Sequence, residues 1–200
     1  RDVERSRGLG DVYKRQTVYA LVAAIDAKDS FTFQHSTNVS QYAVLLAQKL
    51  GLPGDDIQTV KVAGLLHDIG KIGIPESILK KAGKLTNEEY EIMKSHVEKS
   101  IEMIHYLPNM NYVIPAVVSH HERYDGKGYP RGIKGEEIPF LGRILAVCDS
   151  FDAMISKRAY KEPLSVEYAM GELEKNKGTQ FDPEVADAFI ELIKEGKVPL

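Results

Sequence analysis

A helical repeat of apolar residues runs through most of this chain and sets its fold class. Near the start, Val18, Leu21, Val22 and Ile25 stand at positions i, i+3, i+4 and i+7. That spacing places the four side chains on one face of an α-helix. No stretch of comparable length shows the two-residue alternation of a half-buried strand. The pattern therefore predicts an all-α fold, a single bundle of about eight helices.

Further segments carry the same period or a clear signal for a helix end. Their predicted ranges are 39–50, 55–68, 87–105, 111–121, 140–156, 165–177 and a last helix that follows residue 182. Thr86, Ser165 and Asp182 stand where helices should begin, and their side chains can accept hydrogen bonds from free backbone N–H groups. Between them lies a glycine-rich irregular stretch, 122–138, and long irregular stretches in compact domains are usually functional or disordered.

Length and composition fit one folded domain at residues 17–200. The chain has 200 residues, of which 43% are hydrophobic, enough for one well-buried core. Residues 1–16 show no clear amphipathic period and are predicted to be a tail or linker remnant. The single cysteine, Cys148, lies in an apolar run and is predicted to be a core residue, which excludes a disulfide framework.

The chain shows no sign of a membrane segment or an export signal. No apolar run approaches the ~18 residues that a bilayer-spanning helix needs. These features favour the cytoplasm, with no membrane contact in this fragment. The formal net charge of −3 argues against long DNA or RNA as a partner, because such partners require a basic excess. A small anionic substrate remains compatible with a locally positive pocket.

Histidines and aspartates stand at predicted helix ends and on core-facing positions. His67-Asp68 and His120-His121 each end an apolar helix, His96 lies beside an apolar stripe, and Asp149 lies inside an apolar helix. Burying such groups costs on the order of several kcal/mol unless something compensates their desolvation, and divalent cations do so. Seven residues are candidate metal ligands: His35, His67, Asp68, His96, His120, His121 and Asp149.

The ligand types indicate two transition-metal ions. Nitrogen and oxygen donors without a thiolate suit iron or manganese, with nickel or zinc as alternatives. Seven ligands are too many for one ion, whereas two ions that share a bridging carboxylate fit them. Two such ions about 3.5–4 Å apart can activate a bridging hydroxide for attack on a phosphoester. The sequence thus predicts a metal-dependent phosphohydrolase.

Three basic residues are candidates for binding phosphate. Lys71 follows His67-Asp68-Ile69-Gly70 directly, which favours a place beside the reacting phosphate over an ordinary surface position. Arg158 and Lys161 follow the Asp149 helix and are suited either to a second phosphate or base or to a solvated helix end.

Two long motifs resemble those of a known family. The runs His67-Asp68-Ile69-Gly70-Lys71 and His120-His121-Glu122-Arg123-Tyr124-Asp125-Gly126-Lys127-Gly128-Tyr129-Pro130 closely resemble the HD-GYP subgroup of the HD phosphohydrolase superfamily. Asp149-Ser150-Phe151-Asp152-Ala153-Met154 and Arg158-Ala159-Tyr160-Lys161 look like its later motifs. The resemblance covers about residues 17–196.

The resemblance implies a helical domain that hydrolyses cyclic di-GMP to linear pGpG or GMP. By position, Asp68 would bridge the two metals and act in catalysis with Lys71, which would lie by the scissile phosphate. His35, His67 and Asp149 would complete one metal shell, and His96, His120 and His121 would hold the other metal. Tyr129 would shape the mouth of the site, and Arg158 and Lys161 would contact the distal part of the ligand. His105 matches no motif.

Two positions depart from the family pattern. Some members carry a glutamate four residues before the first histidine ligand and hold three metals, whereas this chain has Phe31 there. Phenylalanine cannot ligate a metal, so we expect two ions. Ala159 replaces the usual proline, which frees the backbone φ angle beside Arg158.

The sequence is compatible with three alternatives. The chain could be an HD phosphohydrolase for another cyclic nucleotide, such as cyclic GMP-AMP, since the base preference cannot be read from these motifs. It could also be a non-catalytic module that binds cyclic di-GMP, or a structural helical domain with buried polar pairs. The resemblance further implies an upstream sensory or receiver domain, and a second copy of the chain is a candidate partner in a homodimer.

Overall fold

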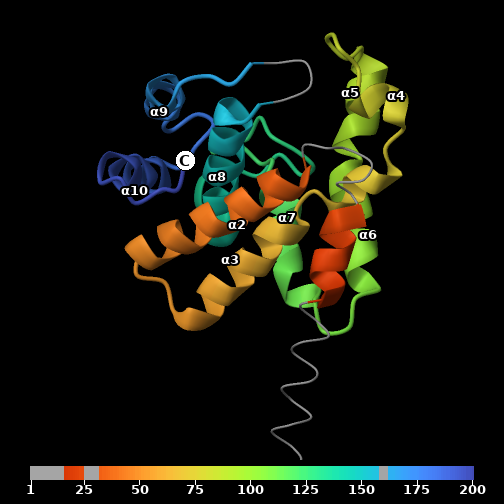
Figure 1. The fold of residues 1–200 in the computed structure, drawn as a ribbon, viewed down its shortest axis with the longest axis horizontal. Coiled ribbons are helices and arrows are strands. Elements are labelled where there is room, and N and C mark those ends of the chain that lie inside the picture. The colour runs from red at the N-terminus through yellow and green to blue at the C-terminus, as the bar shows by residue number, and fades with distance from the viewer. Residues whose placement is uncertain (1–15, 25–31, 158–161) are drawn as a thin grey trace, which may run out of the picture.

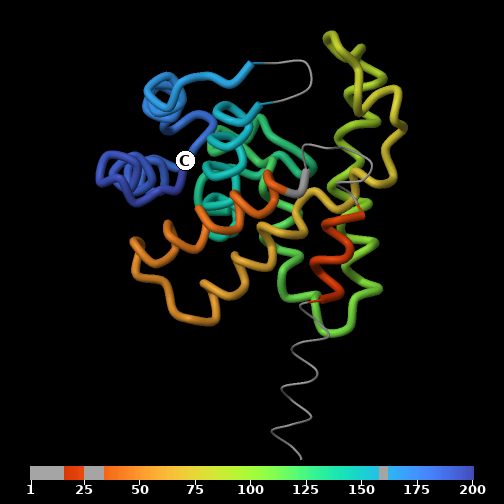
Figure 2. Tube along the Cα trace, viewed as in Figure 1, coloured from red at the N-terminus to blue at the C-terminus, as the bar shows by residue number. Residues whose placement is uncertain are grey.

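The computed structural model describes residues 16–24, 32–157 and 162–200 as a helical domain (Figures 1 and 2). Residues 16–24 are helical, and no β-strand occurs in the described ranges, where the one bridge joins Lys177 and Phe181. The all-α prediction is confirmed. The remaining α-helices are α2 (Thr32–Lys49), α3 (Gly54–Leu66), α4 (Glu76–Leu79), α5 (Asn87–Lys94), α6 (His96–His105), α7 (Ile114–Ser119), α8 (Phe140–Ile155), α9 (Val166–Lys175) and α10 (Pro183–Lys194). Three 3-10 helices join them: η1 (Ile69–Gly73), η2 (Asn111–Val113) and η3 (Gly135–Glu137).

Helices α2, α3 and α8 form the centre of the bundle. Helix α2 packs along α3 and against α8, and α7 also packs on α8. Figure 1 shows α9 and α10 on one side of α8, while α4, α5 and α6 lie on the opposite side of the molecule. Residues 1–15, 25–31 and 158–161 lie outside the described parts, so Phe31, Arg158 and Lys161 are not placed.

The apolar stripes read from the sequence form the core. Tyr42, Phe151 and Phe189 meet at its centre, with ring centroids 5.8 Å apart for Tyr42 and Phe151 and 5.1 Å apart for Phe151 and Phe189. Val39 and Leu46 on α2 are fully buried beside them. Cys148 is fully buried and is a core residue, as predicted.

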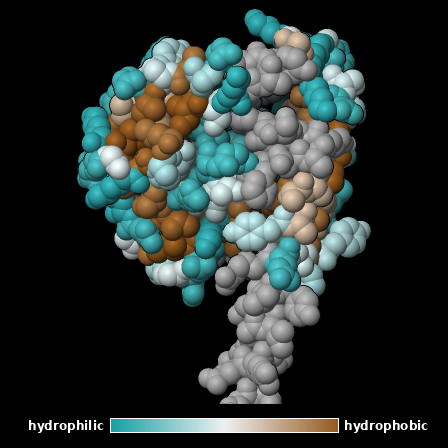
Figure 3. All heavy atoms as spheres, in the orientation of Figure 1, coloured by the Kyte–Doolittle hydropathy of each residue, from teal (hydrophilic) through white to brown (hydrophobic). Residues whose placement is uncertain are grey.

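The surface does not suggest a membrane-spanning segment in the parts of the chain that are described. None of the helices there combines the length and the apolar character needed to cross a bilayer. The face in Figure 3 carries hydrophilic side chains among separate hydrophobic patches.

The predicted helix 87–105 is wrong in one respect, because it breaks at Ser95 into α5 and α6. The Ser95 N–H is shared between the carbonyls of Glu91 (3.3 Å) and Ile92 (3.2 Å), and its Oγ donates to the Ile92 carbonyl at 2.6 Å. A serine side chain that competes for helix carbonyls commonly bends or ends a helix. The break makes His96 the first residue of a new helix.

Two other predicted helices end earlier than expected. Helix α3 stops at Leu66 and α7 stops at Ser119, so His67-Asp68 and His120-His121 lie in the turns that follow. These four residues therefore sit directly beyond helix C-termini rather than inside the last turn.

Gly70 sets the contact between η1 and α6. A Cβ atom at this position would overlap the His96 carbonyl oxygen and the Ser100 backbone nitrogen. The Gly70 N–H donates to Ser100 Oγ at 2.8 Å, and that hydroxyl donates to the His67 carbonyl at 3.1 Å. The close approach, which only glycine permits, brings Asp68 next to His96.

The N-caps expected from the sequence are present. Thr86 forms a full capping box with Glu89, and Ser165 Oγ accepts from the Tyr168 N–H at 3.1 Å. Asp182 Oδ1 accepts from the Glu184 N–H at 2.9 Å, while its Oδ2 accepts from Arg143 Nη1 at 2.6 Å. Asp182 thus caps α10 and also ties it to α8.

We expect Asp182→Ala to destabilise the domain more than Ser165→Ala does. The first change removes a cap and leaves the largely buried Arg143 without its carboxylate, which should cost about 2–3 kcal/mol. The second removes an exposed cap alone and should cost about 1 kcal/mol. Urea denaturation followed by circular dichroism measures both. Equal losses would show that the Arg143 ion pair contributes nothing.

Candidate metal centre

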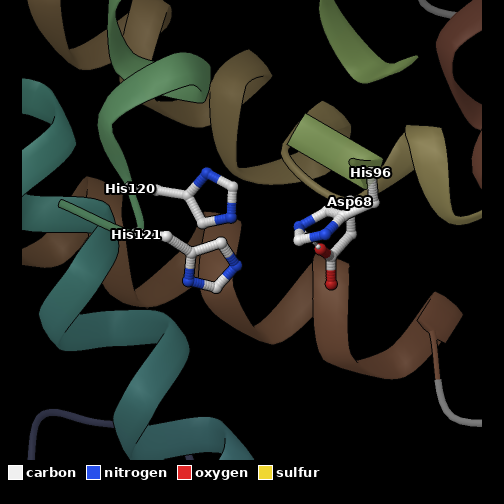
Figure 4. Close-up of side chains that lie close together, drawn as sticks. All are labelled: Asp68, His96, His120 and His121. Atoms are coloured by element: carbon white, nitrogen blue, oxygen red, sulfur yellow. Dashed lines mark ion pairs between the residues drawn. The ribbon is translucent and has the colours of Figure 1, made fainter. Parts of the chain in front are cut away.

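The structure brings all seven candidate ligands together in two neighbouring groups. The Asp68 group comprises Asp68, His96, His120 and His121, and the Asp149 group comprises His35, His67 and Asp149. Within each group the candidate ligand atoms all lie within 4.8 Å of one another. Figure 4 shows the rings of His120 and His121 directed toward Asp68 and His96. The arrangement gathers side chains from α2, α6, α8 and the turns after α3 and α7.

Asp68 faces histidine nitrogens of both groups. Its Oδ1 is 3.3 Å from His96 Nε2, while its Oδ2 is 3.4 Å from His67 Nε2 and 3.7 Å from His35 Nε2. One carboxylate thus faces both sets of nitrogens, the geometry expected of a bridging ligand. Within the Asp149 group, Asp149 Oδ1 lies 3.1 Å from His35 Nε2.

Backbone carbonyls fix the orientation of three imidazole rings. The Nδ1 atoms of His67, His96 and His120 lie 2.7, 2.7 and 2.6 Å from the carbonyl oxygens three residues earlier in the chain. A carbonyl only accepts hydrogen bonds, so Nδ1 carries the proton in each neutral ring. The lone pair is then on Nε2, the atom that points into the centre. Metal-binding histidines are commonly held in this way.

The role of Asp152 was not predicted from the sequence. This carboxylate is fully buried, and its Oδ2 accepts from His35 Nδ1 at 2.7 Å and from Ser156 Oγ at 3.0 Å. Asn38 Nδ2 donates to its Oδ1 at 2.8 Å. Asp152 therefore orients His35 as the carbonyls orient the other rings. The available signal was a second carboxylate three residues after Asp149, on the same face of an apolar helix.

Several buried polar atoms at the centre fit metal ions. His67 Nε2, Asp68 Oδ1, His96 Nε2 and His120 Nε2 are buried and make no hydrogen bond. An unsatisfied buried polar atom costs about 1–3 kcal/mol, so four together need a compensating partner. All four are donor atoms for a divalent transition metal. The two clusters are consistent with a binuclear metal site.

Burial keeps the histidines of the Asp68 group neutral. It lowers the pKa of His96 and holds the pKa of His120 well below its usual value. Burial also lowers the pKa of His121 to about 3. Neutral imidazole is the form that binds a metal, so these rings are ready to ligate at neutral pH.

The Asp149 group and Asp68 hold negative charge. Burial acts to raise the pKa of Asp68, but the charges of Lys71 and His67 outweigh it and keep that pKa well below its usual value. Burial acts to lower the pKa of His67, but the nearby carboxylates of Asp68 and Asp149 raise it to about 10. The carboxylates therefore favour a positive charge at this place, whether a proton or a metal ion supplies it.

The centre opens to solvent on one side. Five of the seven ligand residues are buried, whereas His121 and Asp149 are partly exposed. Lys71 lies at this side, with its Nζ 2.6 Å from Asp68 Oδ2 and its side chain 20% exposed. His105 lies elsewhere, hydrogen-bonded to Asn111 at 3.0 Å on the surface.

The glycine-rich loop is folded against the opening. Tyr129 stacks on His121, with ring centroids 4.9 Å apart and an angle of 25° between the planes. The buried carboxylate of Glu122 holds the loop, because it accepts from the backbone N–H groups of Arg131 (2.7 Å) and Gly132 (3.0 Å). This role of Glu122 was not predicted from the sequence. Its position directly after His120-His121, at the start of a loop with many free N–H groups, was the available signal.

Three proteins of similar sequence are named as phosphodiesterases of cyclic dinucleotides. The chain is 41% identical over 179 residues to the cyclic di-GMP phosphodiesterase response regulator RpfG of Xanthomonas campestris, and the match covers 88% of this chain and 47% of that protein. It is 44% identical over 170 residues to a cyclic di-GMP phosphodiesterase of Thermotoga maritima, with 84% and 46% covered. It is 38% identical over 179 residues to the 3'3'-cGAMP-specific phosphodiesterase 2 of Vibrio cholerae, with 88% and 34% covered. The chain thus spans about half or less of the length of these relatives.

One solved structure has a similar fold, and the model of a protein family matches the sequence. The crystal structure of a cyclic GMP-AMP specific phosphodiesterase from V. cholerae matches with a TM-score of 0.71 at 18% identity, covering 90% of this chain and 49% of that one. Residues 20–185 match the model of the HD domain. This match covers most of the chain and agrees with the motifs at His67-Asp68, and it shows that the protein belongs to the HD-domain family.

Proposed function

We propose that this chain is the catalytic domain of a metal-dependent phosphodiesterase that hydrolyses cyclic di-GMP to pGpG, GMP or both. The observation that carries the proposal is the pair of buried ligand groups with Asp68 between them. The named activities of the Xanthomonas and Thermotoga relatives supply the substrate.

In the proposed site, each group holds one divalent ion. His96, His120 and His121 would bind one ion, His35, His67 and Asp149 the other, and Asp68 both. Iron or manganese suits these nitrogen and oxygen donors. Two bound ions would supply positive charge at the phosphate and make a water molecule more acidic.

The residues of the chain would place the reacting groups. Water adds to phosphorus while the bond from phosphorus to a ribose oxygen breaks, and the leaving oxygen takes up a proton. The ammonium group of Lys71 lies at the exposed side of Asp68, where it can bind a non-bridging phosphate oxygen. The Arg158 and Lys161 contacts with the distal part of the ligand stay predictions, since both residues lie outside the described parts.

A second candidate substrate is cyclic GMP-AMP. One relative of 38% identity is named as specific for 3'3'-cGAMP. The arrangement of the candidate metal ligands is compatible with either substrate, because they do not read the base. A non-catalytic binding module is less well supported, because such a module has no need to bury seven converging ligand groups. Hydrolysis assays on cyclic di-GMP, cyclic GMP-AMP and cyclic di-AMP in parallel, with iron and with manganese, separate these candidates.

We expect Asp68→Asn to abolish turnover. The amide is similar in shape but lacks the charge needed to bridge two cations, so kcat should fall at least about a hundredfold. The measurement is cyclic di-GMP hydrolysis by metal-loaded protein. Asp55→Asn makes the same change at an exposed position on α3 and should leave activity unaltered. Full activity of Asp68→Asn after metal repletion would contradict the two-metal proposal.

Asp152→Asn should weaken metal binding at the Asp149 group alone. The amide can still accept from His35 but no longer makes its ring more basic, and changes of this kind typically cost about 10- to 100-fold in metal affinity. Titration with a competing chelator should show loss of one ion before the other. Ser156→Ala removes one hydrogen bond from Asp152 and keeps its charge, so its effect should be smaller. Unchanged affinity in Asp152→Asn would exclude the orienting role.

Lys71→Met should reduce kcat for cyclic di-GMP about 10- to 100-fold while two ions stay bound. The physical reason is the loss of a positive charge beside the phosphate. Metal analysis distinguishes this from damage to Asp68, its ion-pair partner. Lys61→Met, at an exposed position on α3, serves as the matched control. If Lys71→Met loses its metal together with its activity, Lys71 supports the centre rather than the substrate.

A further inference from the structure

An aromatic path leads outward from the metal centre to α5. His121 stacks on Tyr129, and Tyr129 meets Tyr90 in a T-shaped arrangement, with ring centroids 6.4 Å apart and an angle of 80° between the planes. Tyr129 is partly buried, whereas Tyr90 is 48% exposed. The path therefore ends on an aromatic ring that solvent, or a ligand, can reach.

Lys94 adds a positive charge to the outer end of this path. Its Nζ lies 5.4 Å from the centroid of the Tyr90 ring and 5.7 Å from that of Tyr129, a cation–π arrangement with both. The side chain is 25% exposed, and its ion-pair partner, Glu91, is exposed on the same helix. An exposed ion pair of this kind contributes little, so the ammonium group is available to another anion.

Helix α5 presents these two side chains together. Tyr90 and Lys94 are four residues apart, which places them on the same face of the helix. The capping box at Thr86 fixes the start of α5, and the break at Ser95 fixes its end beside His96. The position of Tyr90 and Lys94 relative to the metal centre is thus defined by the fold and not by a free loop.

The proposed substrate needs contacts beyond the cleaved phosphate. A cyclic dinucleotide has two phosphates and two bases, and only one phosphate can react at the centre at a time. The rest of the ligand must extend outward past the opening. A purine base stacks well on an exposed aromatic ring, and an ammonium group binds phosphate.

We propose that Tyr90 and Lys94 form an outer nucleotide subsite, in which the Tyr90 ring stacks on a purine base and the Lys94 ammonium binds the phosphate that is not cleaved. One face of Tyr129 is already covered by His121, so Tyr90 offers the accessible ring. This inference rests on the proposed function, because it assigns contacts to the substrate of the same site.

The test compares a dinucleotide with a small phosphodiester that lacks bases. The substrates are cyclic di-GMP and bis(p-nitrophenyl) phosphate, and the variants are Tyr90→Ala, Tyr90→Phe and Lys94→Met. Loss of one stacked base should raise KM of Tyr90→Ala for cyclic di-GMP about 5- to 100-fold, with kcat changed less than about twofold. Tyr90→Phe keeps the ring and should behave as wild type. Lys94→Met should raise KM about three- to fivefold.

Controls separate a subsite from a structural role. Hydrolysis of bis(p-nitrophenyl) phosphate and metal content should be unchanged in every variant, because neither depends on a base contact. Tyr168→Ala replaces a tyrosine of similar exposure, 53%, on α9, which lies on the other side of the molecule (Figure 1), and should leave KM unaltered. Equal losses with both substrates, or an unchanged KM for cyclic di-GMP in Tyr90→Ala, would overturn the outer subsite.

Failure of the underlying function gives a different result. Wild-type protein that cleaves bis(p-nitrophenyl) phosphate but neither binds nor hydrolyses any cyclic dinucleotide overturns both proposals. If Tyr90→Ala and Lys94→Met hydrolyse cyclic di-GMP with the KM of the wild-type protein, the outer subsite alone is overturned.

Discussion

Three hydrogen bonds from histidine Nδ1 atoms to backbone carbonyls orient the imidazole rings on which the candidate metal centre depends. The acceptors are the carbonyls of Gly64, Met93 and Val117, each in the last turn of a helix: α3, α5 and α7. Carbonyls in the last turn have no partner within their own helix. The histidine that follows three residues later satisfies one of them and turns its Nε2 toward the centre. The C-terminal ends of α3 and α7 carry the negative ends of their helix dipoles, which also favours cations.

This arrangement explains why helix ends matter more than helix interiors in this chain. If α3 and α7 continued through His67 and His120, those carbonyls would accept from backbone N–H groups instead. The break at Ser95 ends α5, so that the Met93 carbonyl can accept from His96 Nδ1. The ends of α3 and α7 have the same effect for His67 and His120. The close approach at Gly70 then brings the turn after α3 onto α6, so that Asp68 can face both groups of ligands.

The sequence predicted the fold class, the core stripes and the convergence of the seven candidate ligands, because each rests on a local period or a motif. It did not predict the break at Ser95, since the apolar period passes through that residue without interruption and serine is tolerated within helices. Nor did it predict the partners of Asp152 and Glu122. Asp152 meets a histidine 117 residues away, and Glu122 binds backbone N–H groups nine and ten residues ahead. Such contacts depend on how the chain is packed, which no local pattern encodes.

The buried charges also resolve how an acidic chain can bind an anionic substrate. The formal net charge is −3, yet the proposed ligand set contains only two carboxylates, Asp68 and Asp149, and its histidines in the Asp68 group stay neutral. In the proposed site, two divalent ions would bring more positive charge than these two carboxylates cancel, and Lys71 would add to it at the opening. The acidic residues that set the overall charge lie mostly on exposed helix faces, where solvent and salt screen them. The field that the proposed phosphodiester substrate would meet is therefore set by the centre and not by the whole protein.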